Sequence, residues 1–159
     1  MTAYEQRILF RVGAREIVRA EWRGGSGKTA GDLGYQLAPN VSALLLRFNG
    51  LCQAIAADIL SFPEAADRAR AIERAIVVAR ELKSVNNFQQ LAAVVCALGS
   101  ASVQRLRVSW GLVAPEFASE YAEYQRLCSV DEEYRAIRTA ALACQSVPCV
   151  PYQIGRAHV

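Results

Sequence analysis

The chain contains very little histidine. Of its 159 residues only His158 is a histidine, and it lies one residue from the end. Histidine-centred nucleophile systems and His-rich metal sites therefore have no basis here. The adjacent acids Asp131, Glu132 and Glu133 point to different sides of a helix, so we interpret them as the first turn of one. The sequence predicts no catalytic residue, no metal and no cofactor.

Long runs of like charge and long apolar runs are also missing. The net charge of +3 is spread over 18 basic and 15 acidic residues, which argues against nucleic acid as a partner. The longest uncharged stretch, Ser84–Gln104, contains the continuous apolar run Leu91–Leu98, which is too short to cross a bilayer. We expect no direct membrane insertion, and no N-terminal signal segment is recognisable.

The cysteines form an odd set without the close spacing of metal or redox motifs. Most lie among apolar neighbours, so we expect buried free thiols in a reducing compartment, with the cytoplasm as the location. The five are Cys52, Cys96, Cys128, Cys144 and Cys149.

One glycine-rich stretch, residues 22–32, resembles a phosphate-binding loop. That loop requires a glycine, four free positions and then Gly-Lys-Ser/Thr, because its backbone N–H groups wrap the phosphates. Gly27, Lys28 and Thr29 supply the end of the pattern, but Trp22 stands where the first glycine is needed. We interpret the stretch as a surface connection. An independent nucleotide hydrolase using Lys28 is the weaker alternative.

Apolar residues recur at helical spacing through most of the chain. One stripe runs from Val41 to Ile59, with Asn40 as the expected N-cap. A second helix is expected to start at Pro63 and to bury a stripe from Ile72 to Leu82.

A third helix is expected to begin at Asn86 or Asn87 and to stop at Gly99, where we expect a left-handed turn. It is apolar nearly all round and should be the core helix. A short helix over Val103–Trp110 and two stripes at 117–128 and 130–144 follow. No alternating strand pattern of useful length appears. The expected fold is all-α, an orthogonal helical bundle.

Three blocks of the sequence resemble the catalytic domain of Ras-family guanine nucleotide exchange factors, the RasGEF domain. They are Leu37–Leu60, Val85–Trp110 and Val147–Tyr152, in the family's order and spacing. Residues 9–22 are similar to the family's N-terminal helices, so the resemblance covers almost the whole chain. The matching motif residues that we expect to be mainly structural are Arg47, Phe48, Asn49, Asn86, Asn87, Phe88, Arg105, Leu106, Trp110, Pro148, Cys149 and Pro151.

The resemblance implies a protein that promotes GDP release from a small GTPase. In the family, an apolar pocket grips the switch II segment while a helical hairpin displaces switch I. Carried over by position, the pocket residues are Leu45, Ala92, Gly99, Tyr134 and Tyr152. For Leu45 and Ala92 an ordinary core role is as consistent with the sequence. The family usually has Asn where Gly99 stands, which puts in doubt the strength of the switch II contact or the GTPase recognised.

The end of the sequence departs further from the family. The family continues after the Pro-Cys-Val-Pro block into a strand-like segment and the hairpin, whereas residues 153–159 match a translated sequencing adapter. We expect residues 1–152 to be a partial RasGEF catalytic domain, truncated before the hairpin, and residues 153–159 to be a non-native tail. Such a fragment should exchange nucleotide slowly or not at all alone.

The expected partner is a GTPase of the Ras, Rap or Ral class. A cytoplasmic protein would reach membrane surfaces through the lipidated GTPase. The alternative is a noncatalytic helical scaffold or GTPase-binding module, which Gly99 favours.

Overall fold

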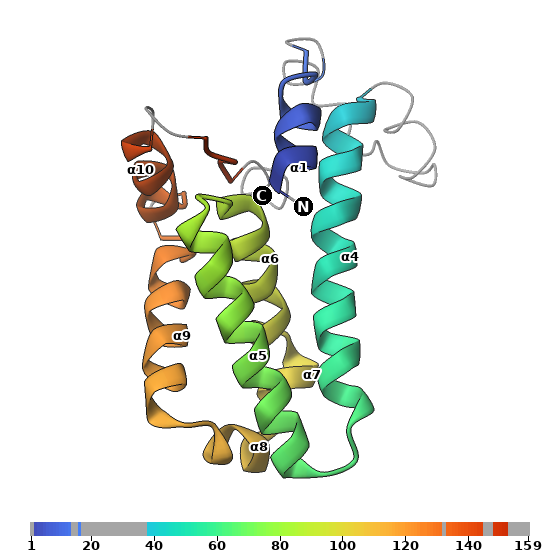
Figure 1. Cartoon of the computed structure of the whole chain (residues 1–159), viewed down its shortest axis with the longest axis vertical. Coiled ribbons are helices and arrows are strands. Elements are labelled where there is room, and N and C mark those ends of the chain that lie inside the picture. The colour runs from blue at the N-terminus through green and yellow to red at the C-terminus, as the bar shows by residue number, and fades with distance from the viewer. Residues whose placement is uncertain (1, 14–15, 17–37, 132, 145–147, 153–159) are drawn as a thin grey trace.

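The described part of the chain is built from helices. The computed structural model describes residues 2–13, 16, 38–131, 133–144 and 148–152, and no β-strand is found among them (Figure 1). The helices are α1 (Thr2–Leu9), α4 (Pro39–Ser61), α5 (Ala65–Ser84), α6 (Phe88–Gly99), α7 (Ala101–Gln104), α8 (Arg107–Leu112), α9 (Pro115–Leu127) and α10 (Arg135–Ala143). The all-α prediction is confirmed. The loop with Lys28 at residues 22–32 and the tail at 153–159 lie outside the described residues.

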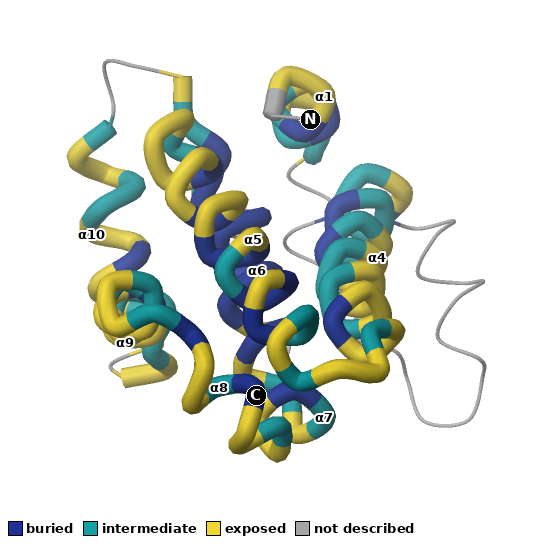
Figure 2. The backbone as a smooth tube through the Cα atoms, turned by 60° about the horizontal axis from the view of Figure 1, so that its bottom comes forward, coloured by how far each residue is buried: buried dark blue, intermediate teal, exposed yellow. Residues whose placement is uncertain are grey.

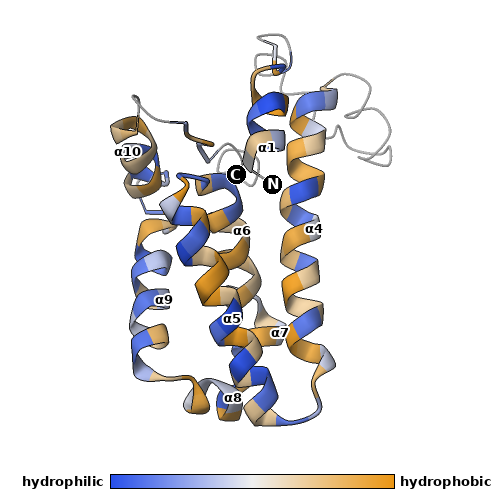
Figure 3. Cartoon of the chain, viewed as in Figure 1, coloured by the Kyte–Doolittle hydropathy of each residue, from blue (hydrophilic) through white to orange (hydrophobic). Residues whose placement is uncertain are grey.

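Helix α6 is the core helix of the bundle, as its composition predicts. Ten of its twelve residues are buried. Helices α4 and α5 pack along it and α9 also contacts it. In Figure 2, α6 is buried along most of its length, whereas α4, α5 and α9 each keep an exposed outer face. Figure 3 shows the same division as hydrophilic turns on the outer helices. Removing these apolar side chains from water is the main drive for folding.

The ends of α6 agree with the sequence in position but differ in conformation at one end. Asn87 is the N-cap, and its side chain accepts a hydrogen bond from the Gln90 N–H at 3.1 Å. The helix ends at Gly99, as predicted. However, Gly99 is not left-handed, and the chain leaves the helix through Ser100 in an extended conformation. The expected left-handed turn is therefore wrong.

The start of α4 is capped by a residue that the sequence did not indicate. Asn40 is not the N-cap, because the helix begins at Pro39 and the cap residue Ala38 offers no side-chain bond. Instead Glu16 Oε2 accepts the backbone N–H groups of Asn40 (3.0 Å) and Val41 (3.1 Å), while Oε1 accepts Asn40 Nδ2 (2.7 Å). A carboxylate is favoured there by the helix dipole.

Two predicted helices are shorter than their apolar stripes. The helix expected over Val103–Trp110 is broken at Arg105 and Leu106 into α7 and α8. The break lets the Trp110 indole N–H donate back to the Val103 carbonyl at 3.1 Å. A single straight helix could not close that bond, since the two residues would lie two turns apart.

Helix α10 begins later than the sequence suggests. It starts at Arg135, so Asp131 and Glu133 precede it rather than forming its first turn. Glu133 (φ 56°) and Tyr134 (φ 62°) are both left-handed, a conformation that costs non-glycine residues about 1–2 kcal/mol each. Packing of the Tyr134 ring, described below, offsets this cost.

Helix α4 also has the length and composition of a membrane span, which sequence analysis did not note. It packs along α6 and α1, and it buries Leu44, Phe48 and Ile59 in the bundle. Its Arg47 side chain forms an ion pair with Glu5 of α1. We interpret α4 as a helix that packs one face on the bundle, because such an apolar helix can have the length and composition of a membrane span.

The Glu16 cap predicts an acid-sensitive contribution to stability. Burial alone would raise the pKa of Glu16, but hydrogen bonds from the Asn40 side chain and from the N–H groups of Val41, Gly13 and Asn40 lower it below its usual 4.5. A carboxyl group with a lowered folded-state pKa stabilises the protein above its unfolded pKa and loses this effect as the pH falls through the folded value.

We therefore expect Glu16→Gln to lower the free energy of unfolding by about 1–2 kcal/mol near neutral pH. The glutamine amide would place a donor against a donor N–H. Below pH 4.5 the difference from the wild type should shrink. Urea unfolding across pH measures this, with Glu81→Gln at an exposed position of α5 as the control. A difference that stays constant with pH would contradict the assignment.

Candidate functional site

A buried carboxylate joins α1, α4 and the start of α6. Glu5 is fully buried, and it accepts hydrogen bonds from Arg47 Nε at 3.3 Å and from Asn87 Nδ2 at 2.5 Å. The Arg47 guanidinium also lies 4.9 Å from the centre of the Tyr4 ring. Buried charges persist only where they are paired and hydrogen-bonded. Two residues of the sequence motif, Arg47 and Asn87, therefore have a structural role, through an acid that the motif does not contain.

The Pro-Cys-Val-Pro block is attached to the start of α6 through its backbone. Val150 accepts a hydrogen bond from the Phe88 N–H and donates one to the Asn86 carbonyl, both at 2.9 Å. Asn86 is left-handed (φ 55°). The Cys144 thiol donates to the Asn86 side-chain oxygen at 3.3 Å. These contacts fix the position of the segment that carries Tyr152.

Tyr152 lies between two other aromatic rings. Its ring centre is 5.1 Å from that of Tyr134 and 6.5 Å from that of Phe48. Burial, followed by the effect of nearby Tyr134, raises the pKa of the Tyr152 hydroxyl above its usual value. Tyr152 is thus an uncharged, half-buried aromatic side chain at neutral pH. The structure brings together Tyr134 and Tyr152, two of the five predicted pocket residues.

Three small residues lie on one stripe of α6, because they are spaced by four and three positions. We call Ala92, Cys96 and Gly99 the α6 strip. Ala92 is buried, whereas Cys96 and Gly99 are exposed. Leu45, on α4, is half-buried and packs against the core. The start of α6, where Val150 is attached, is about 18 Å from its end at Gly99. Of the five predicted residues, Tyr152 lines the cavity described below.

Cysteines and aromatic rings surround the middle of the α6 strip. Burial raises the pKa of the Cys52 and Cys128 thiols to about 12, and the nearby Cys96 thiol adds to both shifts. Cys96 has the same secondary effect on Tyr121 and Tyr152. Helices α4 and α9 both contact α6, and the Cys52 thiol of α4 donates to the Ala93 carbonyl of α6 at 3.1 Å. Thiols with a raised pKa are poor nucleophiles at neutral pH.

The expectation of buried cysteines is only partly met. All five are free thiols, but Cys96 is exposed and the other four are half-buried. Among the described residues, no three histidine, cysteine or acidic side chains gather where they could hold a metal ion.

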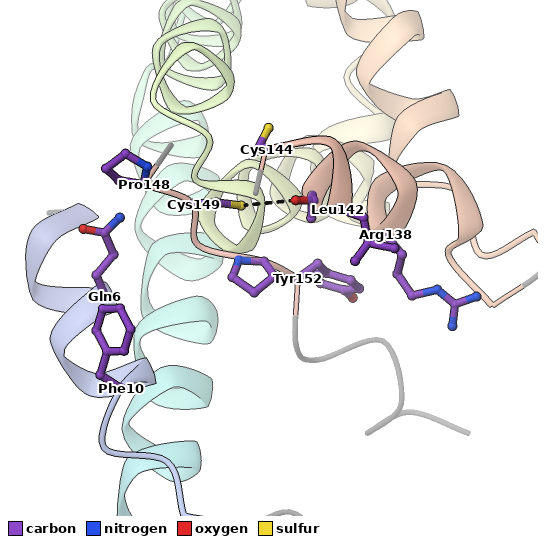
Figure 4. Close-up of a pocket in the computed structure, with 10 residues that line it drawn as sticks. Gln6, Phe10, Arg138, Leu142, Cys144, Pro148, Cys149 and Tyr152 are labelled. Carbon is purple, nitrogen blue, oxygen red and sulfur yellow. Dashed lines mark hydrogen bonds between the residues drawn. The ribbon is translucent and has the colours of Figure 1, made fainter. Parts of the chain in front are cut away.

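A cavity of about 650 Å³ lies elsewhere, between α1, α10 and the segment at residues 148–152 (Figure 4). Tyr152 is the one predicted pocket residue that lines it, together with the motif residues Pro148, Cys149 and Pro151. Its walls are mainly apolar, and Phe10, which directly follows α1, is strongly exposed. No residue of the α6 strip lines this cavity, whereas Tyr152 does.

The other motif residues have varied surroundings. Phe48 and Phe88 are buried in the core, and Trp110 stacks on Tyr121 at 5.2 Å between ring centres. Arg105 and Leu106 lie at the break between α7 and α8. Asn49 is exposed on α4, and its side chain has no hydrogen bond to another described residue. No contact in the structure explains why Asn49 belongs to the motif.

Glu5 holds Arg47 and Asn87 in place, and the sequence alone did not indicate this role. It is the acid in a helix that also buries Ile8, three residues later on the same face. The sequence did contain one signal for this role: Glu5 is an acidic residue at a position where the helical spacing predicts a buried apolar one. Its partner Asn87 is 82 residues away, a distance that no local pattern can bridge.

Comparison with known proteins identifies the family. The RasGEF domain matches residues 1–154. The chain is 24% identical over 152 residues to Ras guanine nucleotide exchange factor M and 35% identical over 116 residues to exchange factor J, both from Dictyostelium discoideum. It is 31% identical over 118 residues to the zebrafish (Danio rerio) Ras-specific guanine nucleotide-releasing factor RalGPS1. The chain belongs to the RasGEF domain family.

These matches cover different shares of the proteins compared. They include 96%, 72% and 74% of this chain, respectively, but only 16%, 14% and 20% of the three relatives. The chain thus spans at most a fifth of the length of these relatives. The family match includes residues 22–32, so the loop with Lys28 lies within the RasGEF domain.

The geometry at the start of α6 predicts a large effect of Asn87. Asn87→Ala removes both the α6 cap and one of the bonds to buried Glu5, so we expect the free energy of unfolding to fall by about 2–4 kcal/mol. Asn49→Ala, at the exposed position of α4, is the matched control and should change it by less than about 0.5 kcal/mol. Urea unfolding compares the two. Equal losses would contradict the role assigned to Asn87.

Proposed function

We propose that this chain is part of a guanine nucleotide exchange factor for a Ras-type small GTPase. The membership of residues 1–154 in the RasGEF family is the observation that carries the proposal. The structure supports it through the α6 strip, which is open at Cys96 and Gly99, and through the aromatic pair Tyr134 and Tyr152. Small residues let a partner approach the helix closely, and aromatic residues are frequent anchors in interfaces.

The proposed activity needs no reactive group in this chain. A GTPase that binds nucleotide with picomolar affinity holds it by about 16 kcal/mol, so spontaneous release is slow. A protein that binds the nucleotide-free GTPase more tightly must weaken nucleotide binding by the same factor, because the two equilibria are linked. No covalent bond is made or broken. The thiols of the site, which are protonated at neutral pH, are consistent with a role in binding.

In this proposal the switch II segment of the GTPase contacts Leu45, Ala92, Gly99, Tyr134 and Tyr152. The contribution of Leu45 and Ala92 is mainly to shape the surface, since one is half-buried and the other buried. Tyr134 and Tyr152 are both half-buried, so part of each ring is free to contact the partner. The partner belongs to the Ras, Rap or Ral class, and the complex forms in the cytoplasm at membranes where the lipidated GTPase is anchored.

A noncatalytic GTPase-binding scaffold is the second candidate. Gly99 favours it, because the family's usual Asn would offer a hydrogen-bonding side chain that glycine lacks. The two functions differ in which state of the GTPase binds. An exchange factor must prefer the nucleotide-free form, whereas a scaffold has no such requirement.

We expect the chain to bind a nucleotide-free GTPase more tightly than the same GTPase loaded with GDP. Biolayer interferometry with purified Ras-, Rap- and Ral-type GTPases, each in both states, measures this difference. Equal affinity for the two states would support the scaffold. Absence of binding to every member in either state would contradict both functions.

The aromatic pair provides a second measurement in the same assay. Tyr152→Ala should weaken binding of the nucleotide-free form at least about tenfold, because it removes an aromatic anchor. Val78→Ala, at an exposed apolar position of α5, is the control and should bind like the wild type. Thermal unfolding of each variant checks that the fold is retained. An unchanged affinity of a folded Tyr152→Ala variant would exclude this residue from the interface.

A further inference from the structure

The exposed side of α4 carries no charged residue over about three turns of the helix. In Figure 2 this side faces away from α6. The only charged residue between Leu46 and Ala57 is Arg47, whose guanidinium pairs with buried Glu5 at 3.3 Å. We call the exposed residues of this stretch the α4 outer face: Leu46, Asn49, Gly50, Gln53, Ala54 and Ala57.

Such a face is unusual for a helix that meets water. Surface helices normally carry charged and polar side chains opposite the core, whereas the centre of a protein interface is depleted of charge. Helix α5, which has a similar length, follows the usual pattern, since its exposed residues include Arg70, Arg74, Arg80, Glu81 and Lys83. The composition of the α4 outer face is therefore that of a contact surface.

The α4 outer face is accessible to a partner. Leu46 is 62% exposed, and a Cβ atom added at Gly50 would meet no atom within 4 Å. The Asn49 carboxamide is exposed and has no hydrogen bond to another described residue. A partner can therefore reach both side chains without any movement of the bundle.

One edge of this face adjoins the α6 strip. Leu45, Asn49 and Cys52 lie on one flank of α4, because they are spaced by four and three positions. The Cys52 thiol donates to the Ala93 carbonyl of α6 at 3.1 Å, and Ala93 is next to Ala92 of the strip. Asn49, about one turn before Cys52, therefore lies on the edge of the outer face that borders α6.

The chemistry of this edge suits an uncharged partner segment. A carboxamide offers a donor and an acceptor, the same groups that one backbone peptide unit offers. A charged partner group would lose part of its hydration against α4, and the outer face has no opposite charge to replace it. An apolar side chain beside a backbone peptide unit avoids this cost.

We propose that Leu46 and Asn49, at the edge of the α4 outer face, belong to the GTPase-binding surface. Leu46 packs against an apolar side chain of the switch II segment, and the Asn49 carboxamide pairs with a backbone peptide unit of the same segment. The GTPase is the occupant because this edge is continuous with the α6 strip. The inference rests on the proposed function, and it adds two residues to the contact surface.

Asn49→Ala tests the carboxamide in the interferometry assay. We expect the affinity for the nucleotide-free GTPase to fall about threefold to tenfold, the usual effect of one lost hydrogen bond. The unfolding temperature should not fall, because alanine favours a helix and the carboxamide has no bond within the described chain.

Asn49→Asp keeps the size of the side chain but replaces the donor with a charged oxygen. It should bind at least as weakly as Asn49→Ala, because a carboxylate repels the backbone carbonyl that the carboxamide would donate to. Tighter binding by Asn49→Asp would reveal a cationic partner group and would overturn the pairing with a peptide unit.

A charge placed at Leu46 tests the uncharged character of the contact. Leu46→Lys and Leu46→Glu should each weaken binding at least about tenfold, because a charge of either sign must lose hydration against an uncharged segment. Val78→Lys and Val78→Glu, at an exposed apolar position of α5, are the matched controls and should bind like the wild type. Opposite effects of the two Leu46 variants on affinity would overturn the proposed contact.

The outcomes separate this contact from the proposed function. If the wild type prefers the nucleotide-free GTPase and the Leu46 and Asn49 variants bind equally well, the contact is wrong and the function stands. If the wild type binds no Ras-, Rap- or Ral-type GTPase, both are overturned.

Two further measurements test other occupants of the α4 outer face. Sedimentation equilibrium detects self-association, and flotation with vesicles of phosphatidylcholine and phosphatidylserine detects lipid binding. We expect a monomer that does not float with the vesicles. Self-association or vesicle binding that Leu46→Glu abolishes, while GTPase affinity stays unchanged, would assign the face to that partner and overturn its assignment to the GTPase.

Discussion

The buried carboxylate of Glu5 is the interaction on which the arrangement of the site depends. It receives hydrogen bonds from Arg47 of α4 and Asn87 at the start of α6, so three helices share one charge. Asn87 also caps α6, and the adjacent residues Asn86 and Phe88 bind Val150. Removing one partner would leave a buried charge insufficiently compensated. The position of the Tyr152 ring therefore derives from a charge at the opposite end of the sequence.

The sequence was sufficient for elements whose signals are local. Apolar periodicity located α4, α5 and α6, and it placed the start of α6 at Asn86 or Asn87, of which Asn87 is the cap. The Glu16 cap could not be found this way, because it acts on Asn40 from 24 residues away. The same limit applies to Glu5. The break between α7 and α8 depends on where Trp110 can bond, and the left-handed pair at Glu133 and Tyr134 depends on the packing of one ring against Tyr152.

The sequence predicted which residues belong to the candidate site better than it predicted how they are arranged in space. Matching the motif supplied Tyr134 and Tyr152, which do contact one another. It could not show that the cavity near Tyr152 is lined by residues of α1 and α10. Catalytic and metal sites use residue types that are easy to recognise in a sequence. A binding surface is built from ordinary residues and is therefore harder to recognise.

The two prolines that flank the attachment of Val150 have a mechanical consequence. Pro148 and Pro151 have no N–H group, and their rings hold φ near −65°. Pro151 is the only residue between Val150, which is hydrogen-bonded to the start of α6, and Tyr152. The chain between them therefore has little conformational freedom. The segment from Val150 to Tyr152 is therefore conformationally restricted. A small rotation of the first turn of α6 would be transmitted to the aromatic ring as a displacement instead of being absorbed by the backbone.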